Sequence, residues 1–488
     1  MRLTKKIFLQ YSKIPEPVKA SVWFTICNII QKGIALITTP IFTRIMTTQQ
    51  YGQYSVYQSW YSIVAIFATL NLYAGVYNNG MIKWPEKRKQ FTSAMQGLST
   101  SLTVLLFVIY LLAMNWWNSL LGMSSVFVLA MFAELLFVPA YNFWAAGQRF
   151  DYKYKKLVVI TVGMGILSPI VGVLAVLTTD YKAEARVLSF VFVQVCVGLL
   201  FYIYNMRQGR VFLKTKYWKF ALAFNLPLIP HYLAQTVLGQ ADRIMIQRMI
   251  GETEAALYSV AYSISMMFNI VTNAINNSFI PYTYKALRER KYVRLRENAN
   301  FLVTMIASAC VIATAFAPEI ISIFASAEYY DAHNAVPPIA ISLLFIFITS
   351  LFGNIEFYYE KTKFIMIASS VAAITNIALN YYAIPTWGYV AAAYTTLICY
   401  ILLAFAHYIM YSILLRKNKG EEDLSTSVYD VKYIAKVSVA SIGMMFFLTV
   451  IYENTILRYF VLGLILLVIF IKRRKIVECL NELKRSDG

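Results

Sequence analysis

The stretch TRIMTTQQYGQYSV, residues 43–56, joins two long apolar segments, Ser21–Phe42 and Tyr54–Tyr77, into a hairpin. A related stretch, RMIGETEAALYSV, residues 248–260, joins two later apolar segments. In both stretches an arginine stands ten residues before the tripeptide Tyr-Ser-Val, with a short polar link between them. An internal repeat at this distance indicates two related halves, an organisation that is common among membrane transporters.

The composition supports a chain that spans a membrane. Hydrophobic residues make up 59% of the 488 positions and charged residues only 14%, whereas soluble proteins contain roughly half and a quarter. The apolar blocks recur at roughly 20 residues, the length that crosses a hydrocarbon core of about 30 Å. The formal net charge is +20, but most of it lies in short links between these blocks. We therefore expect membrane lipids as partners and no nucleic acid.

The apolar blocks predict an all-α integral membrane protein with fourteen spanning helices, arranged as six, six and a final pair. The predicted helices are Ser21–Phe42, Tyr54–Tyr77, Phe91–Met114, Val126–Ala146, Leu157–Thr178, Val187–Tyr204, Phe220–Met245, Ala255–Ile280, Asn298–Phe316, Val336–Tyr358, Phe364–Ile384, Val390–Leu415, Tyr433–Tyr452 and Ile456–Ile471. The expected domains are an N-terminal cytoplasmic segment 1–20, an N-lobe 21–204, a linker 205–219, a C-lobe 220–415, a linker with the last helix pair 416–471, and a basic tail 472–488.

Loop charge predicts the orientation of these helices. With the N-terminus in the cytoplasm, the cytoplasmic pieces hold about four fifths of the 44 lysines and arginines. Such a bias orients short loops, so both termini are expected in the cytoplasm. The outer links are short, for example Trp117–Ser125 and Thr179–Arg186. An enzyme acting outside the membrane more often has a long outer loop, which makes a glycan polymerase or ligase the less favoured reading.

Lys32 is the clearest polar residue inside a predicted span. It lies roughly 16 Å along the helix from Ser21, near the membrane midplane. A charge there is expensive, at about 2.5–3.5 kcal/mol or more, and therefore needs a reason. Polar and small residues share its helix face: Ser21, Thr25, Asn28, Ala35 and Thr39. We predict that Lys32, Asn28 and Thr25 line a water-filled cavity that attracts an anionic substrate. The alternative is helix packing, with Lys32 paired to a carboxylate such as Glu134.

The seventh predicted segment combines a helix break with titratable groups. Pro227 and Pro230 remove backbone hydrogen bonds and predict a hinge. His231, Gln235 and Asp242 then share one helix face. Together with Glu134, this stripe predicts coupling of transport to movement of a proton or cation. The alternatives are a structural histidine and an ion pair between Asp242 and a nearby arginine.

Three arginines lie near the outer ends of the two repeated hairpins: Arg44, Arg243 and Arg248. Each is explained individually by a side chain that reaches the membrane interface. Their matched placement also predicts a basic outer rim that receives or releases phosphate.

No common catalytic or nucleotide-binding motif is found in the sequence, so we expect a transporter rather than an enzyme. The three histidines are scattered, and the five cysteines lack metal-ligand spacing, so we expect no metal and no cofactor. Without a nucleotide motif, the driving force is expected to be the membrane potential, the substrate's own gradient, or an H⁺ or Na⁺ gradient.

Two quoted stretches resemble a known family. PIFTRIMTTQQYGQYS, residues 40–55, resembles the first-hairpin signature of bacterial polysaccharide repeat-unit flippases, the Wzx-type members of the multidrug/oligosaccharidyl-lipid/polysaccharide exporter superfamily. ADRIMI, residues 241–246, and ALYSVAY, residues 256–262, resemble the second-lobe signature of the same family. One departure is Thr48-Gln49, where a proline often follows the first arginine.

The resemblance implies two six-helix lobes around a central cavity, related by a pseudo-two-fold axis, with twelve to fourteen helices. It implies movement of an undecaprenyl-diphosphate-linked oligosaccharide from the inner to the outer leaflet by alternating access, for a surface polysaccharide such as O-antigen or capsule. Polysaccharide polymerase or assembly proteins are implied as partners. Lipid II flippases and MATE drug exporters share this fold, so a MATE-type cation antiporter is the main alternative.

Overall fold

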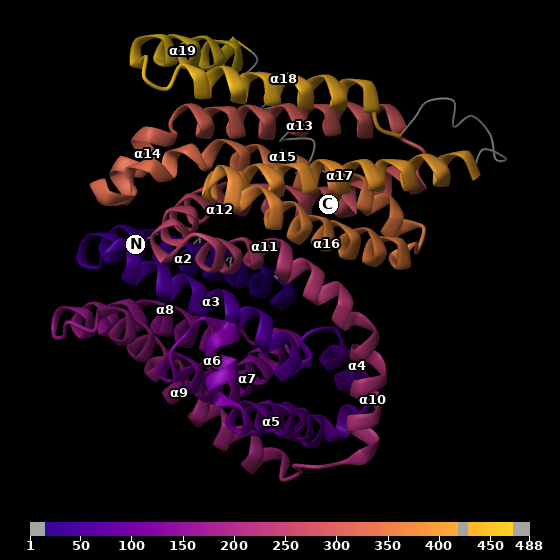
Figure 1. Ribbon diagram of the computed structural model, residues 1–488. Coiled ribbons are helices and arrows are strands. Elements are labelled where there is room, and N and C mark those ends of the chain that lie inside the picture. The colour runs from indigo at the N-terminus through magenta and orange to yellow at the C-terminus, as the bar shows by residue number, and fades with distance from the viewer. Residues whose placement is uncertain (1–14, 418–427, 472–488) are drawn as a thin grey trace, which may run out of the picture. The chain divides into compact units, whose positions relative to one another are not determined.

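The computed structural model describes residues 15–417 and 428–471, and every regular element in these ranges is a helix (Figure 1). The chain divides into two compact units, Met1–Leu233 and Ala234–Gly488, which we describe separately. The predicted basic tail 472–488 and most of the predicted N-terminal segment 1–20 lie outside the described residues.

Within its described residues, the first unit contains ten helical elements up to residue 225. They are α2 (Glu16–Ile45), α3 (Thr48–Thr69), α4 (Gly75–Lys83), the 3₁₀ turn η1 (Pro85–Lys87), α5 (Arg88–Leu112), α6 (Met114–Leu121), α7 (Ser125–Phe150), α8 (Tyr154–Leu177), α9 (Lys182–Gly209) and α10 (Thr215–Asn225). A second 3₁₀ turn, η2 (Leu226–Leu228), leads into α11 (Ile229–Met249), which crosses the boundary between the units.

The second unit is also helical throughout its described part. Its elements after α11 are α12 (Glu252–Arg288), α13 (Tyr292–Ala315), α14 (Ala317–Phe324), η3 (Ala327–Asn334), α15 (Val336–Tyr358), α16 (Thr362–Trp387), α17 (Tyr389–Lys417), α18 (Val431–Val450) and α19 (Thr455–Ile471). The apolar helix α15 is the centre of this unit, because α12, α13 and α17 all pack against it.

The predicted class, an all-α integral membrane protein, is confirmed. Within the described residues, eleven helices are long and apolar enough to cross a membrane, against the fourteen that were predicted. The difference falls on three predicted segments, 54–77, 220–245 and 456–471. They correspond to the Tyr- and Gln-rich α3, to the interrupted pair α10 and α11, and to the short apolar α19.

The repeated hairpin begins with α2 and α3, and a side-chain cap defines the turn between them. The Thr47 hydroxyl accepts a hydrogen bond from the Gln50 backbone N–H at 3.3 Å, and the Thr47 N–H donates to the Gln50 side chain at 3.0 Å. This reciprocal pair is a capping box, which satisfies two N–H groups at the start of a helix. The cap starts α3 without the proline that is common in the family at this point.

The second predicted segment, Tyr54–Tyr77, is not one helix. α3 ends at Thr69 because Leu70 and Asn71 both adopt left-handed backbone conformations, with φ of 49° and 50°. Such a conformation interrupts helical hydrogen bonding, and the chain restarts as the short α4. The freed carbonyl oxygen of Leu70 accepts a hydrogen bond from the Asn225 side chain at 2.6 Å, so the break is held by α10.

The predicted break in the seventh segment is present. Pro227 lies in η2, and Pro230 lies in the first turn of α11, where its missing N–H removes no helical hydrogen bond. The rigid rings therefore separate α10 from α11. That this break acts as a hinge during transport stays a prediction.

Candidate functional site

The predicted polar face of α2 lies outside the core of the first unit. Thr25, Asn28 and Lys32 are all exposed, although α2 as a whole is apolar enough to span a membrane. Lys32 lies roughly 24 Å from the start of α2 and 20 Å from its end at 1.5 Å per residue. The ammonium group is thus near the middle of the helix, and the described residues do not cover it.

The alternative partner of Lys32, Glu134, is buried elsewhere in the first unit. Glu134 lies on α7 with 3% of its surface exposed, and its Oε2 accepts a hydrogen bond from the Tyr57 hydroxyl of α3 at 2.8 Å. Within the described residues, no ion pair joins Lys32 to Glu134. The alternative reading, in which Lys32 forms an ion pair with Glu134, is therefore not seen in the described structure.

Asp242 is the centre of a buried polar network in the second unit. Its carboxylate accepts hydrogen bonds from Asn380 at 2.7 Å, from Thr396 at 2.8 Å and from the Tyr258 hydroxyl. Asn376 extends the network by donating to Thr396 at 3.1 Å. The donors come from α12, α16 and α17, and Asp242 itself is 1% exposed. The carboxylate is bound by neutral donors instead of the arginine that was the alternative partner.

The other members of the predicted coupling stripe are not part of this network. Gln235 is exposed and donates to the Ser369 hydroxyl at 3.3 Å. His231 is partly buried, and its Nδ1 has no hydrogen-bond partner within the described residues. The hydrogen bonds of Asp242 therefore lead to α12, α16 and α17, and neither of these two residues donates to it.

The three predicted rim arginines have different surroundings. Arg44 and Arg248 are exposed, and Arg44 donates to the Pro40 carbonyl one turn earlier at 3.0 Å. Arg243 is buried, with its guanidinium 4.4 Å from the centre of the Tyr262 ring and hydrogen-bonded to Gln240 at 2.8 Å. Arg243 is therefore held by a cation–π contact and its own helix, whereas Arg44 and Arg248 lie at the surface.

Arg186 is a residue that the sequence reading placed in an outer link without a role. It lies one turn inside α9, is 6% exposed, and lines a polar cavity of about 310 Å³ within the first unit. Its guanidinium stacks 3.9 Å from the centre of the Phe42 ring and donates to the Tyr54 hydroxyl at 3.2 Å. The signal available in the sequence was Tyr54 itself, which is part of the repeated Tyr-Ser-Val tripeptide.

Another carboxylate, Glu356, lies near the C-terminal end of α15. It is fully buried on α15, and its Oε1 lies 2.8 Å from Nδ1 of His407 on α17. The two residues are 51 positions apart in the sequence, and they meet because α15 and α17 pack closely.

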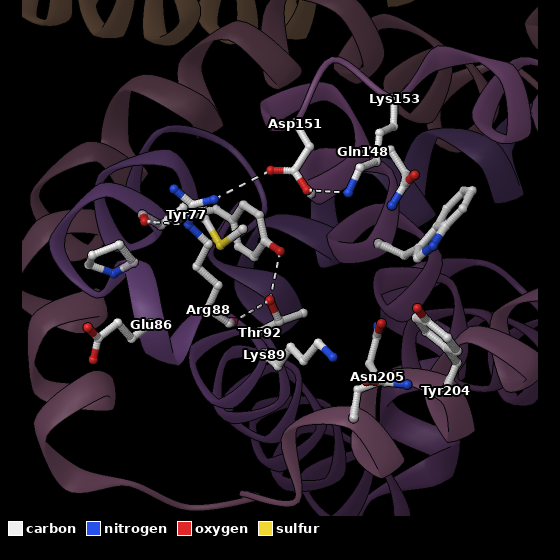
Figure 2. Close-up of a pocket in the computed structure, with 15 residues that line it drawn as sticks. Tyr77, Glu86, Arg88, Lys89, Thr92, Gln148, Asp151, Lys153, Tyr204 and Asn205 are labelled. Carbon is white, nitrogen blue, oxygen red and sulfur yellow. Dashed lines mark hydrogen bonds and ion pairs between the residues drawn. The ribbon is translucent and has the colours of Figure 1, made fainter.

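A second pocket of about 360 Å³ lies where α4, α5, α7 and α9 meet, at the end of the first unit that carries the predicted cytoplasmic links (Figure 2). Asp151 lies between two cations, with Arg88 at 3.5 Å and Lys153 at 3.0 Å. All three side chains are partly or largely exposed, and exposed ion pairs contribute little stability. The charges here largely cancel one another.

The described residues contain no group of three or more His, Cys, Asp or Glu side chains that would hold a metal ion. The candidate functional groups of the first unit are therefore Lys32, Arg186 and the enclosed Glu134, and those of the second unit are the enclosed Asp242 and Glu356. Within the described residues, the eleven helices that are long and apolar enough to cross a membrane define the class of a multi-pass membrane protein.

Comparison with known proteins identifies the family. The profile of the family described as "Polysaccharide biosynthesis protein" matches residues 18–287, more than half of the chain, and the MatE profile matches residues 227–382. The chain belongs to the polysaccharide biosynthesis protein family.

Known relatives and structures agree with this assignment. The "Lsg locus putative protein 1" of Haemophilus influenzae is 22% identical over 382 residues, which cover 74% of this chain and 89% of that protein. The lipid II flippase MurJ in an inward closed conformation superposes with a TM-score of 0.68 at 14% identity, covering 93% of this chain and all of the MurJ chain. An inward-facing multidrug resistance MATE family transporter of the MOP superfamily gives a TM-score of 0.62 at 16% identity, covering 83% of this chain and all of the other.

Proposed function

We propose that this protein is a flippase for undecaprenyl-diphosphate-linked oligosaccharides, which it moves from the inner to the outer leaflet of a bacterial cytoplasmic membrane by alternating access. The product would supply the assembly of a surface polysaccharide, such as O-antigen or capsule, by polymerase and assembly proteins. Membership of the polysaccharide biosynthesis protein family supports this substrate class.

The observation that carries the proposal is Lys32. A lysine in the middle of an apolar, membrane-spanning helix is unfavourable in lipid by about 2.5–3.5 kcal/mol or more. Lys32 is exposed on α2 and shares its face with the equally exposed Thr25 and Asn28. A polar passage containing a diphosphate would satisfy all three groups, because the ammonium pairs with phosphate oxygens and the neutral side chains bind water or sugar hydroxyls.

The acidic residues favour this proposal over a MATE-type antiporter of organic cations. A site for such a cation needs an accessible carboxylate, but Glu134 and Asp242 are buried and bound by hydroxyl and amide donors. The exposed charge in the middle of α2, on Lys32, is positive. The MatE profile match over residues 227–382 makes the antiporter the alternative to test, and sugar transfer by a polymerase or ligase is a third, less favoured activity.

The remaining parts of the mechanism follow from the same positions. Arg44 and Arg248 would each provide a positive charge at the outer end of its own hairpin, and the break at Pro227 and Pro230 would let the seventh span change shape. Glu134 and Asp242, with His231 and Gln235, are the groups that we propose for coupling to an H⁺ or Na⁺ gradient. Both chain termini are proposed to lie in the cytoplasm.

The proposal is tested with purified protein in vesicles that contain a fluorescent undecaprenyl-diphosphate oligosaccharide. We expect Lys32→Ala to slow its appearance in the opposite leaflet by about tenfold, the loss of one charge-assisted contact, and Lys32→Glu to slow it further. The matched control is Lys155→Ala, which removes an exposed lysine in the first turn of α8. Wild-type rates in both Lys32 variants would remove the headgroup role from Lys32.

The same vesicles distinguish the alternatives. Uptake of an organic cation dye in exchange for protons, without lipid movement, would identify a MATE-type antiporter. Transfer of sugar from the lipid to an acceptor by the purified protein would identify a polymerase or ligase.

A further inference from the structure

A groove of about 620 Å³ lies at the end of the first unit where α2 and α8 begin. The C-terminal ends of α7 and α9 complete it, and all of its lining residues belong to this unit. Its volume is in the range of sites for small molecules. One wall is shared with the pocket of Figure 2, through the residues Trp144, Gln148, Asp151, Lys153 and Tyr204. The groove is therefore a larger hollow beside that pocket, at the end of the unit that carries the predicted cytoplasmic links.

Three charged side chains give the shared wall a positive charge. The Asp151 carboxylate lies 3.5 Å from Arg88 and 3.0 Å from Lys153. Two cations and one anion leave one positive charge in excess. An ammonium group has three donors, and Lys153 is 66% exposed while donating to Asp151. Lys153 can therefore donate to a ligand in the groove at the same time.

The remaining acid at the groove does not cancel this excess. Glu16, at the start of α2, is already paired with Lys19 at 3.1 Å. Lys156, in the first turn of α8, lines the groove, is exposed and forms no ion pair within the described residues. The groove thus presents ammonium groups whose charge is not neutralised, and it is suited to an anion.

Aromatic side chains indicate that the groove lies at the depth of the lipid headgroups. Trp144 lines it and is 8% exposed, and Tyr152 and Tyr204 line it with 51% and 50% of their surfaces exposed. Tyr154 stacks on Trp23 of α2, with the ring centres 6.1 Å apart. Tryptophan and tyrosine concentrate at membrane–water interfaces, where the ring contacts hydrocarbon and its polar atom contacts water. A ligand at this depth has access to both surroundings.

An apolar stripe on α8 leads away from the groove. Its members are 48–71% exposed and share one helix face, and we call them the α8 stripe: Val159, Ile166, Ile170, Leu174 and Leu177. The stripe begins three residues after Lys156 and continues to the end of α8. Exposed apolar surface on a spanning helix contacts acyl chains, which are as apolar as leucine. The charged groove and the stripe together suit a molecule with an anionic head and hydrocarbon chains.

We propose that this groove binds the headgroup of an anionic phospholipid of the inner leaflet, with Lys153 and Lys156 at the phosphate and the acyl chains along the α8 stripe. Basic pockets between spanning helices on the cytoplasmic side bind headgroups of this kind. The stripe favours a lipid over a soluble anion, because a soluble anion gains nothing from apolar surface beside its site. This phospholipid stays bound and is not transported, so the inference goes beyond the proposed function and does not depend on it.

The test is native mass spectrometry of the purified full-length protein in neutral detergent, titrated with phosphatidylglycerol or with phosphatidylcholine. Each bound lipid adds its own mass, so the affinity of the first bound molecule is measured directly. We expect the first phosphatidylglycerol to bind about tenfold more tightly than phosphatidylcholine, because each lysine near an anionic headgroup strengthens binding by about fivefold.

The role of the two lysines is tested by Lys153→Gln/Lys156→Gln. This variant should bind phosphatidylglycerol about tenfold more weakly and lose the preference over phosphatidylcholine. Lys153→Arg/Lys156→Arg keeps both charges and should retain the preference. The matched control is Lys216→Gln/Lys219→Gln, which removes two exposed lysines of α10 in the same unit that do not line the groove. Its affinity should stay within about twofold of the wild type.

Four results would overturn the proposal. Equal affinity of the wild-type protein for the two lipids, or unchanged phosphatidylglycerol affinity in Lys153→Gln/Lys156→Gln, would show that the groove does not select an anionic headgroup. Displacement of phosphatidylglycerol by glycerol phosphate would identify a site for a soluble anion, and displacement by undecaprenyl diphosphate would assign the groove to the transported lipid. Failure of the proposed function is seen separately, because a wild-type flipping rate in Lys32→Ala leaves the phosphatidylglycerol affinity unchanged.

Discussion

Tyr54 and Tyr258, the first residues of the repeated Tyr-Ser-Val tripeptide, hydrogen-bond to opposite charges. The Tyr54 hydroxyl accepts from the guanidinium of Arg186 at 3.2 Å, whereas the Tyr258 hydroxyl donates to the carboxylate of Asp242. A phenol can both donate and accept, so the same residue at the same place in the repeat stabilises a buried cation in one unit and a buried anion in the other. The two hairpins are related in sequence and differ in the sign of the charge that this tyrosine contacts.

The Asp242 network should be a major source of stability in the second unit. Asp242→Ala leaves the donors of Tyr258, Asn380 and Thr396 without an acceptor, so we expect a loss of about 3 kcal/mol in the free energy of unfolding. Tyr258→Phe removes only one hydrogen bond and should lose about 1 kcal/mol. Thermal unfolding in detergent measures both. The control is Glu328→Ala, which removes an exposed acid in η3. If Asp242→Ala lowered the free energy of unfolding no more than this control does, a structural role for the network would be contradicted.

The buried pair of Glu356 and His407 should behave as one unit. Either single substitution to alanine leaves a buried polar group without its partner, which we expect to destabilise the protein by about 1–3 kcal/mol. The double variant should lose less free energy of unfolding than the two single variants lose together, which corresponds to a coupling energy of about 0.5–3 kcal/mol. The measurement is a double-mutant cycle by thermal unfolding. His333→Ala, a partly exposed histidine in η3, is the control, and full additivity would show that the pair is not coupled.

The break between α10 and α11 should matter for transport more than for stability. In the double variant Pro227→Ala/Pro230→Ala, backbone N–H groups return and the two helices can continue into each other. We expect the flipping rate to fall several-fold while the unfolding temperature stays the same or rises. Pro85→Ala, at an exposed 3₁₀ turn, is the control and should leave both quantities unchanged. A wild-type flipping rate in the double variant would show that the prolines are not a hinge.

The predicted orientation can be tested by chemical labelling. In a variant whose native cysteines are replaced by serine or alanine, a cysteine at Asp180 should react with an impermeant maleimide in intact cells, because the link before α9 is predicted to be outside. A cysteine at Lys155 should react only after the membrane is permeabilised. The opposite pattern at both positions would invert the topology, and it would place the chain termini outside the cytoplasm.

Several features of the fold were predictable from short stretches of sequence. The spans follow from apolar blocks of membrane-spanning length, and the break at Pro227 and Pro230 follows from the missing N–H groups of proline. The exposed face around Lys32 follows from the helical period. Each of these depends on residues within a few turns of one another, so local chemistry is enough. The end of α3 at Thr69 was missed, because the left-handed Leu70 is stabilised by Asn225, a residue far along the chain.

The charged sites inside the units required the tertiary structure. Arg186 lies in what reads as a polar outer link, but folding buries it against Phe42, Tyr54 and Gly172. Likewise, the partners of Asp242 and Glu356 lie on helices that are distant in sequence. The amino-acid sequence alone determined a membrane-spanning helical protein with a repeated hairpin and a cation in its first span, because hydropathy and helical period are local properties. Only the packing of the helices decided which charges are enclosed, because a hydrogen bond forms between groups that folding has brought within about 3 Å of each other.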